Sequence, residues 1–169
     1  MTHSAADRFQ VRPAVSGDAR GIAVVHVRAW QEAYASQLPA EFLAGLDVDQ
    51  RVPRWVSIIE DDVTDVFVAE ADGAIVGWAT SSIGRDKDRP VERELAGIYV
   101  LESVYGMGAG QSLLASAITD KPAYLWILDE NPRAEAFYRR NGFERDGGVR
   151  EQRIGGVSLQ VVRMVRRGG

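Results

Sequence analysis

The stretch "ELAGIYVLESVYGMGAGQSLLASA", residues 94–117, decides the fold because a strand pattern passes through a glycine-rich turn into a helix pattern. Gly106, Gly108 and Gly110 stand at alternate positions and lead directly into residues that favour a helix. Glycine readily adopts conformations that turn successive N–H groups toward one point, and a helix dipole behind them adds partial positive charge. The segment therefore has the physical ingredients of a phosphate-binding turn.

Two common phosphate loops do not fit this segment. A dinucleotide-binding fingerprint requires glycine where this chain has Gln111, and a P-loop requires a lysine that is not nearby. A glycine turn that packs a helix closely against a sheet explains the same spacing. Taken alone, the segment leaves both interpretations open.

The residues before this stretch predict one strand followed by helices. A strand is expected at residues 9–15, and Asp18 opens a segment whose apolar residues recur with helical spacing. Pro39 suits the start of a second helix. Pro53 predicts an interruption in a third helix over residues 48–61, because proline lacks a backbone N–H.

The pattern then changes to alternation. "VTDVFVAE" and "AIVGWATSSIG" predict two strands joined by the turn "ADGA", since Asp-Gly tolerates positive φ. "AYLWIL", residues 123–128, predicts a central strand because it has few polar positions. Asn131 and Gly142 suit the start and end of a helix, and two closing strands are expected near residues 143–153 and 157–165. The order predicts one mixed α/β (α+β) domain over residues 1–169, with its core at about 8–167.

Composition excludes several functional classes. The chain has 169 residues, a net charge of −4 and no cysteine, so thiolate nucleophiles and disulfides are excluded. No segment has the length and apolarity of a membrane helix or of a secretory signal core. The two histidines lack metal-site spacing. We expect a cytoplasmic protein that holds no metal and binds neither nucleic acid nor membrane.

Two segments together resemble the GNAT superfamily of acetyl-CoA-dependent N-acetyltransferases. The family's pyrophosphate loop, Gln/Arg-x-x-Gly-x-Gly/Ala, matches Tyr105, Gly108 and Gly110. The second signature, in "LWILDENPRAEAFYRRNGF", matches Asn131, Ala134, Phe137, Tyr138, Gly142 and Phe143. The loop departs from the pattern in two ways: "ES" stands where a proline is often found, and Tyr105 replaces the usual Gln or Arg and offers no guanidinium to the phosphates.

The resemblance implies a fold and a cosubstrate. The fold is a mixed, mostly antiparallel sheet of about seven strands, flanked by helices and splayed between the fourth and fifth strands. Acetyl-CoA would lie in that gap, with its pantetheine arm along the strand residues Ile98, Tyr99 and Val100. The other residues implied to contact it are Tyr105, Gly106, Gly108, Ala109, Gly110, Gln111, Asn131 and Tyr138.

The resemblance also implies a catalytic arrangement. Tyr138 is the implied acid for the departing thiolate. It shares one helix face with Ala134 and Phe137, so it is expected to point inward. Glu94, at the start of the cofactor strand, is our choice for the base that removes a proton from the amine. Glu32 and a chain of water molecules are the alternatives.

The acceptor pocket is predicted from aromatic residues. His26, Trp30 and Tyr34 follow one another at i, i+4 and i+8, which forms one stripe on the first long helix. Such a stripe usually belongs to the core. Where it is open, Trp30, Tyr34 and Trp78 would hold a cationic acceptor.

The resulting interpretation is an enzyme that moves the acetyl group of acetyl-CoA directly to a primary amine of a small molecule or peptide. The first alternative is a non-catalytic acyl-CoA-binding or regulatory module of the same fold. The second is an unrelated nucleotide-binding domain. Family members are often dimers, so a homodimer is a further expectation from the resemblance.

Overall fold

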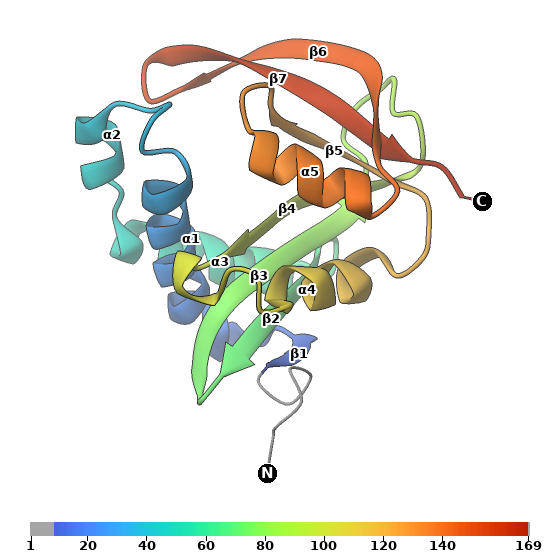
Figure 1. The fold of residues 1–169 in the computed structure, drawn as a ribbon. Helices are drawn as coiled ribbons and strands as arrows, with labels where there is room; N and C mark the ends of the chain where they lie inside the picture. The colour runs from blue at the N-terminus through green and yellow to red at the C-terminus, as the bar shows by residue number, and fades with distance from the viewer. Residues whose placement is uncertain (1–8, 169) are drawn as a thin grey trace.

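The computed structural model describes residues 9–168, which form a seven-stranded sheet with helices on both faces (Figure 1). The strand order is β1-β2-β3-β4-β5-β7-β6, and every neighbouring pair is antiparallel except β4 and β5. The strands are β1 Gln10–Pro13, β2 Asp65–Ala71, β3 Ala74–Ile83, β4 Arg93–Val100, β5 Ala123–Leu128, β6 Glu144–Ile154 and β7 Val157–Arg166. This confirms the predicted mixed, mostly antiparallel sheet.

The sheet is splayed where its two parallel strands meet. β4 and β5 pair at a single position, Glu94 opposite Tyr124. On its other side β4 carries a register shift, so that Leu95 and Gly97 have partners in β3 while Ala96 between them has none. Such a bulge bends a strand away from its neighbour. The remaining edge of β4 that faces β5 therefore keeps its N–H and C=O groups free, and the predicted splay is confirmed.

The helices divide between the two faces of the sheet. Their bounds are α1 Ala19–Ala33, α2 Ala40–Ala44, α3 Val48–Glu60, α4 Ala109–Ile118 and α5 Pro132–Arg140, with short 3₁₀ turns η2 Ser16–Asp18 and η3 Glu102–Val104. Adjacent residues of β2 show the division. Val68 packs with α1 and α3, whereas Ala69 packs in the core that contains α4 and Tyr138 of α5. In Figure 1, α4 and α5 lie in front of the sheet, and α1 lies to the side of β4.

Local signals explain the ends of several elements. Asp72 and Gly73 both have positive φ, 51° and 79°, as the predicted Asp-Gly hairpin turn requires. The Asn131 side chain accepts a hydrogen bond from the N–H of Ala134 at 3.2 Å, which caps α5. Gly142 follows the helix with a φ of +87°.

The interruption predicted at Pro53 is wrong, because α3 runs from Val48 to Glu60 with Pro53 inside it. Proline removes one hydrogen bond, and the carbonyl that loses its donor belongs to Asp49. Asp49 is exposed, so water can satisfy that carbonyl. The buried Trp55 on the same helix anchors it against α1 and the sheet.

Candidate functional site

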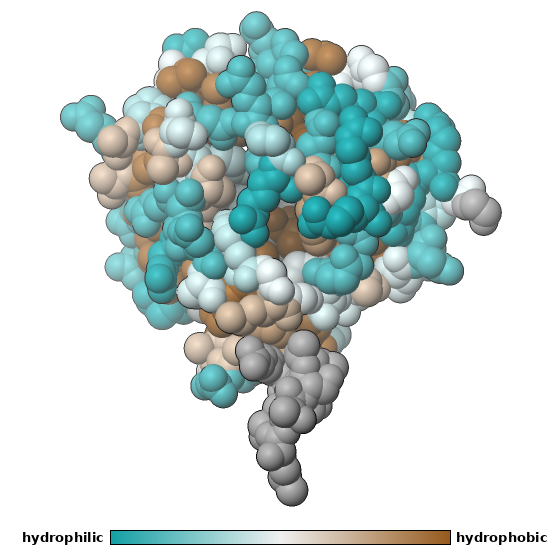
Figure 2. Space-filling model, viewed as in Figure 1, coloured by the Kyte–Doolittle hydropathy of each residue, from teal (hydrophilic) through white to brown (hydrophobic). Residues whose placement is uncertain are grey.

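The splay between β4 and β5 opens into a cavity of about 760 Å³. Its wall includes the free edge of β4, the glycine turn before α4, the first turn of α5 and parts of α1, β5 and β6. Figure 2 shows an apolar recess near the centre of this face of the molecule, bordered by hydrophilic side chains. The cavity exists because two parallel strands diverge, so its walls come from segments far apart in the sequence.

The glycine turn has the backbone geometry of an anion-binding site. Gly106 and Gly108 have backbone φ values of +75° and +95°, which residues other than glycine rarely adopt. Gly108 is the N-cap of α4, and its carbonyl accepts the first bond of the helix from Ser112. The N–H groups between these two residues, those of 109–111, therefore have no acceptor within the helix. They lie at the positive end of the helix dipole.

An arginine that the sequence analysis missed lies beside this turn. The Arg133 guanidinium stacks on the Tyr105 ring, 3.6 Å from its centroid, and both residues line the cavity. Within residues 9–168, no carboxylate forms an ion pair with Arg133. The residues around Arg133 in the sequence do not indicate that it lies beside the glycine turn. The contact joins α5 to a loop residue 28 positions earlier in the sequence.

All the predicted cofactor residues line the cavity. Three are on the β4 edge, Ile98, Tyr99 and Val100. The others are Tyr105, Gly106, Gly108, Ala109, Gly110 and Gln111 around the glycine turn, Asn131 at the N-cap of α5 and Tyr138 on α5. The structure thus brings together residues that the sequence analysis took from three separate segments.

Tyr138 is buried at the base of this wall. It packs edge-on against Phe137 and Phe143, at centroid distances of 5.2 and 5.6 Å. Burial, together with the nearby Tyr99 phenol, raises the pKa of Tyr138 above its ordinary value. Its hydroxyl makes no hydrogen bond to any described residue. The phenol therefore stays protonated at neutral pH and can donate that proton into the cavity.

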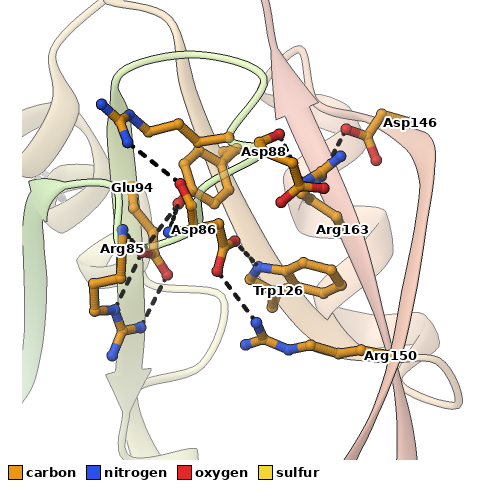
Figure 3. Close-up of polar contacts among 10 residues, drawn as sticks. Arg85, Asp86, Asp88, Glu94, Trp126, Asp146, Arg150 and Arg163 are labelled. Atoms are coloured by element: carbon orange, nitrogen blue, oxygen red, sulfur yellow. Dashed lines mark hydrogen bonds and ion pairs between the residues drawn. The ribbon is translucent and has the colours of Figure 1, made fainter.

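Glu94 lies on the opposite face of the sheet from α4 and α5, because its neighbour Leu95 packs with α4. The Glu94 side chain is 3% exposed and is held by Arg85, which donates from Nη2 to Oε2 at 2.9 Å and from Nε to Oε1 at 3.2 Å (Figure 3). The Arg85 N–H and the Tyr124 hydroxyl also donate to Oε1.

These contacts set the charge state of Glu94. Burial alone raises the pKa of its carboxyl, but the hydrogen bonds and the charge of Arg85 outweigh burial and leave the pKa below its ordinary value. Glu94 is therefore ionised at neutral pH. Oε2 accepts only one of the four hydrogen bonds, so it has capacity for another donor.

Glu32, the competing base, lies elsewhere. Its side chain accepts a hydrogen bond from the N–H of Glu102 at 3.2 Å, and it does not line the cavity. Glu94 is the single carboxylate on the cavity wall among the residues that the structure describes.

The predicted aromatic stripe is divided between core and cavity. Trp30 and Tyr34 line the cavity, and the Tyr34 hydroxyl lies 3.0 Å from that of Tyr99. Trp78 is 5% exposed, packs 4.6 Å from Trp55 between ring centroids and does not reach the cavity wall. The pocket role predicted for Trp78 therefore does not match its position, because its strand turns it toward α1 and α3.

A second group of side chains was also missed. The Trp126 Nε1 donates to Asp86 at 2.7 Å, and the Arg150 guanidinium lies 4.1 Å from the centroid of the Trp126 ring (Figure 3). Arg150 Nη1 also donates to Asp86 at 3.3 Å. These residues come from a loop, from β5 and from β6. No pattern in the sequence connects them, since the loop was recognised only as polar.

Within residues 9–168, no three His, Cys, Asp or Glu side chains are placed to hold a metal ion. No helix in that part of the chain has the length and apolarity needed to cross a membrane.

Comparisons with known proteins agree with this geometry. A family model described as "Acetyltransferase (GNAT) domain" matches residues 62–145. YuaI of Bacillus subtilis (strain 168), an uncharacterized N-acetyltransferase, is 31% identical over 161 residues, which cover 90% of this chain and 89% of that protein.

Two solved structures share the fold. PaiA N-acetyltransferase from Thermoplasma acidophilum in complex with coenzyme A has a TM-score of 0.69 at 18% identity, over 94% of this chain and 98% of that one. YncA from Salmonella typhimurium, a putative acetyltransferase with its cofactor acetyl-CoA, has a TM-score of 0.69 at 19% identity, over 94% and 93% of the two chains. The similarity to YuaI along nearly its whole length, together with the family match across the glycine turn and α5, shows that this chain belongs to the GNAT family of N-acetyltransferases.

Proposed function

We propose that this protein transfers the acetyl group of acetyl-CoA directly to a primary amine of a small molecule or peptide. The observation that carries the proposal is the continuity of one wall of the cavity. Free helix-terminal N–H groups at the glycine turn lead onto the unpaired edge of β4 and end at Tyr138. A diphosphate, an amide-bearing arm and a thioester follow one another in the same order along acetyl-CoA.

The residues present fit this cosubstrate. The backbone N–H groups of residues 109–111 can donate hydrogen bonds to a diphosphate. Gly106 and Gly108 leave space for the diphosphate to approach these groups, because a Cβ added at either glycine would meet no atom within 4 Å. The unpaired edge at Ile98–Val100 offers backbone groups to the amides of the arm. A backbone N–H of that edge can polarise the thioester carbonyl and stabilise the oxyanion that develops during transfer.

Arg133 would replace the guanidinium that the family pattern places at Tyr105. Stacking on the Tyr105 ring fixes the direction of the guanidinium without using its N–H donors. With no carboxylate partner among the described residues, these donors are available to a phosphate oxygen. The guanidinium that would bind the phosphates thus comes from Arg133 of α5 and not from the glycine loop.

Transfer requires two proton movements as the nitrogen–carbon bond forms and the carbon–sulfur bond breaks. Tyr138, protonated at neutral pH, would give its proton to the departing sulfur. Glu94 would attract the amine through Oε2 and accept its proton, directly or through a water molecule. The lowered pKa makes Glu94 a weak base, whether the proton arrives directly or through a water molecule.

Two measurements test this function. Calorimetry of the folded protein with coenzyme A should give a saturable binding heat, and thiol release from acetyl-CoA should rise when an amine panel is added. Saturable binding without release on any amine would favour the non-catalytic module. A melting temperature raised by ATP but not by coenzyme A would favour the unrelated nucleotide-binding domain.

A further inference from the structure

The cavity wall on the face away from α4 and α5 carries two arginines from different elements. Arg150 of β6 stacks on Trp126, which points to this face because its neighbours Leu125 and Ile127 pack in the α4 core. Arg85 reaches the same face through its pair with Glu94. Both arginines line the cavity.

The arrangement on β6 follows the alternation of a strand. Arg150, Gln152 and Ile154 stand two residues apart, and all three line the cavity. Arg153 lies between the last two and does not line it. Two polar side chains with N–H donors, from Arg150 and Gln152, therefore face the cavity side by side.

Each arginine is fixed by a carboxylate and still has unused donors. Arg85 uses Nε and Nη2 for Glu94, which leaves Nη1 without a partner among the described residues, and its side chain is 70% exposed. Arg150 uses Nη1 for Asp86, and within residues 9–168 its Nε and Nη2 donate to no group. A guanidinium held in place with a free edge matches the two oxygens of a carboxylate.

The surrounding charges select between acceptor classes. Arg163 lies on the same side of the sheet but is neutralised by Asp146 at 2.8 Å and Asp88 at 3.3 Å, and none of these three lines the cavity. The ionised groups that line this part of the cavity are Arg85, Arg150 and Glu94; Asp86 pairs with Arg150 from outside the cavity wall, so the four groups together are neutral. A polyamine would find one carboxylate, Glu94, on the described cavity wall for its several positive groups, whereas a molecule with one positive and one negative group would meet a partner for each.

We infer, resting on the proposed function, that the acceptor is a small amino acid: an amine whose own molecule carries a free carboxylate. Its amine binds at Glu94 Oε2, and its carboxylate binds the free donors of Arg150 and Arg85. The ion pair between Glu94 and Arg85 places the sites for the two groups beside each other. In a free amino acid the amine and the carboxylate are attached to the same carbon, whereas in a peptide they stand at opposite ends of the molecule.

The test compares free amino acids with their α-carboxamides, which keep the amine and lack the negative charge. We expect kcat/KM for the preferred amino acid to exceed that for its amide roughly ten- to hundredfold, the range of charge-assisted hydrogen bonds. Arg150→Gln should reduce this ratio about tenfold, the loss of one charge-assisted hydrogen bond, while Arg85 Nη1 keeps a smaller preference and the dissociation constant of coenzyme A changes less than about twofold. Arg150→Lys, which keeps the charge but loses the planar fork, should give an intermediate ratio.

Arg153→Gln is the matched control, on the same strand but away from the cavity, and it should leave the ratio unchanged. Amides or polyamines used as well as the amino acids, or a preference that Arg150→Gln leaves undiminished, would overturn the inference while leaving the proposed function intact. Calorimetry of amino-acid binding in the presence of coenzyme A identifies the opposite case, in which the site exists but the proposed function is wrong. An amino acid that binds the wild type more tightly than it binds Arg150→Gln, without any turnover, would support the amino-acid site and overturn the proposed function.

Discussion

The two sides of the cavity present different kinds of groups: mainly main-chain groups on one side and side chains on the other. The side proposed to bind the cofactor, called here the cofactor wall, consists of the β4 edge at Ile98–Val100, the glycine turn and the start of α5. Most of its polar groups are main-chain N–H and C=O groups. The acceptor wall consists of side chains from α1, the loop after β3, β5 and β6, among them Tyr34, Arg85 and Arg150. A main-chain surface tolerates many side-chain changes but depends on backbone conformation, whereas a side-chain surface can change its specificity one residue at a time.

The largest expected effect is on the backbone of the cofactor wall. Gly108→Asp should weaken coenzyme A binding about a thousandfold, because a carboxylate roughly 4 Å from a phosphate costs about 4 kcal/mol at an effective dielectric constant near 20. Calorimetry on the folded variant measures this loss.

Gly108→Asn is the control for that variant. Asparagine and aspartate tolerate positive φ about equally, so Asn tests backbone strain and side-chain size without the charge. We expect a loss of less than about tenfold. Normal coenzyme A binding by the Asp variant would contradict the cofactor wall.

The second effect concerns the proton donor between the two walls. Tyr138→Phe should lower kcat about a hundredfold, the order of a single general acid, while acetyl-CoA binding changes less than about threefold. The raised pKa of Tyr138 predicts that the wild-type acid remains protonated well into the alkaline range. Kinetics across the pH range tests both points, and equal activity of the variant at every pH would remove Tyr138 from the mechanism.

The third effect tests the one side chain that we assign to phosphate binding. Arg133→Gln should weaken coenzyme A binding about tenfold, as expected for loss of a charge-assisted hydrogen bond. Tyr105→Leu removes the ring on which Arg133 stacks and should cause a similar loss. The double variant should lose no more than about the larger single loss, because the two residues act as one unit. Additive losses would show that they act separately.

The smallest effect is a pH dependence of the free energy of unfolding that arises at His26, which packs against Trp55 of α3 and does not line the cavity. Burial, with the charges of Arg51 and Arg54, lowers the pKa of His26 to about 4, and the Trp55 Nε1 donates to its Nδ1 at 3.3 Å. The unfolded chain keeps the ordinary His pKa of about 6.5 and so binds more protons between these values. The free energy of unfolding should therefore fall as the pH falls through that window.

Between pH 7 and 5 we expect this loss to be about 1 kcal/mol, since the imidazole is partly exposed. His26→Gln cannot titrate and should lack this contribution. Urea unfolding of both proteins at each pH measures the difference, and parallel pH profiles would contradict the assignment to His26.

Features of the cofactor wall could be predicted because each is encoded within a few residues. The positive φ values at Gly106 and Gly108 follow from alternate glycines before a helix, and the cap at Asn131 follows from a side chain that reaches the third N–H after it. The resemblance to the GNAT superfamily connected the glycine turn with the second signature at residues 131–143. Pro53 shows the limit of this reasoning, because tertiary packing of α3 outweighs the loss of a single hydrogen bond.

The acceptor wall could not be predicted in the same way. Asp86, Trp126 and Arg150 are separated by 40 and 24 residues in the sequence, and Trp126 and Arg150 meet because β5, β7 and β6 lie side by side in the sheet. The stack of Arg133 on Tyr105 has the same origin. Trp78 shares the aromatic character of Trp30, but only the direction of its strand decides that it belongs to the core.

The amino-acid sequence by itself determined the helices and strands, the glycine turn and the family, because backbone conformation and capping depend on neighbours along the chain. Only the tertiary structure decided which charges and rings share the cavity with that turn. The reason is physical: hydrogen bonds and ion pairs act over a few ångströms in space, and the strand order brings together residues from opposite ends of the chain.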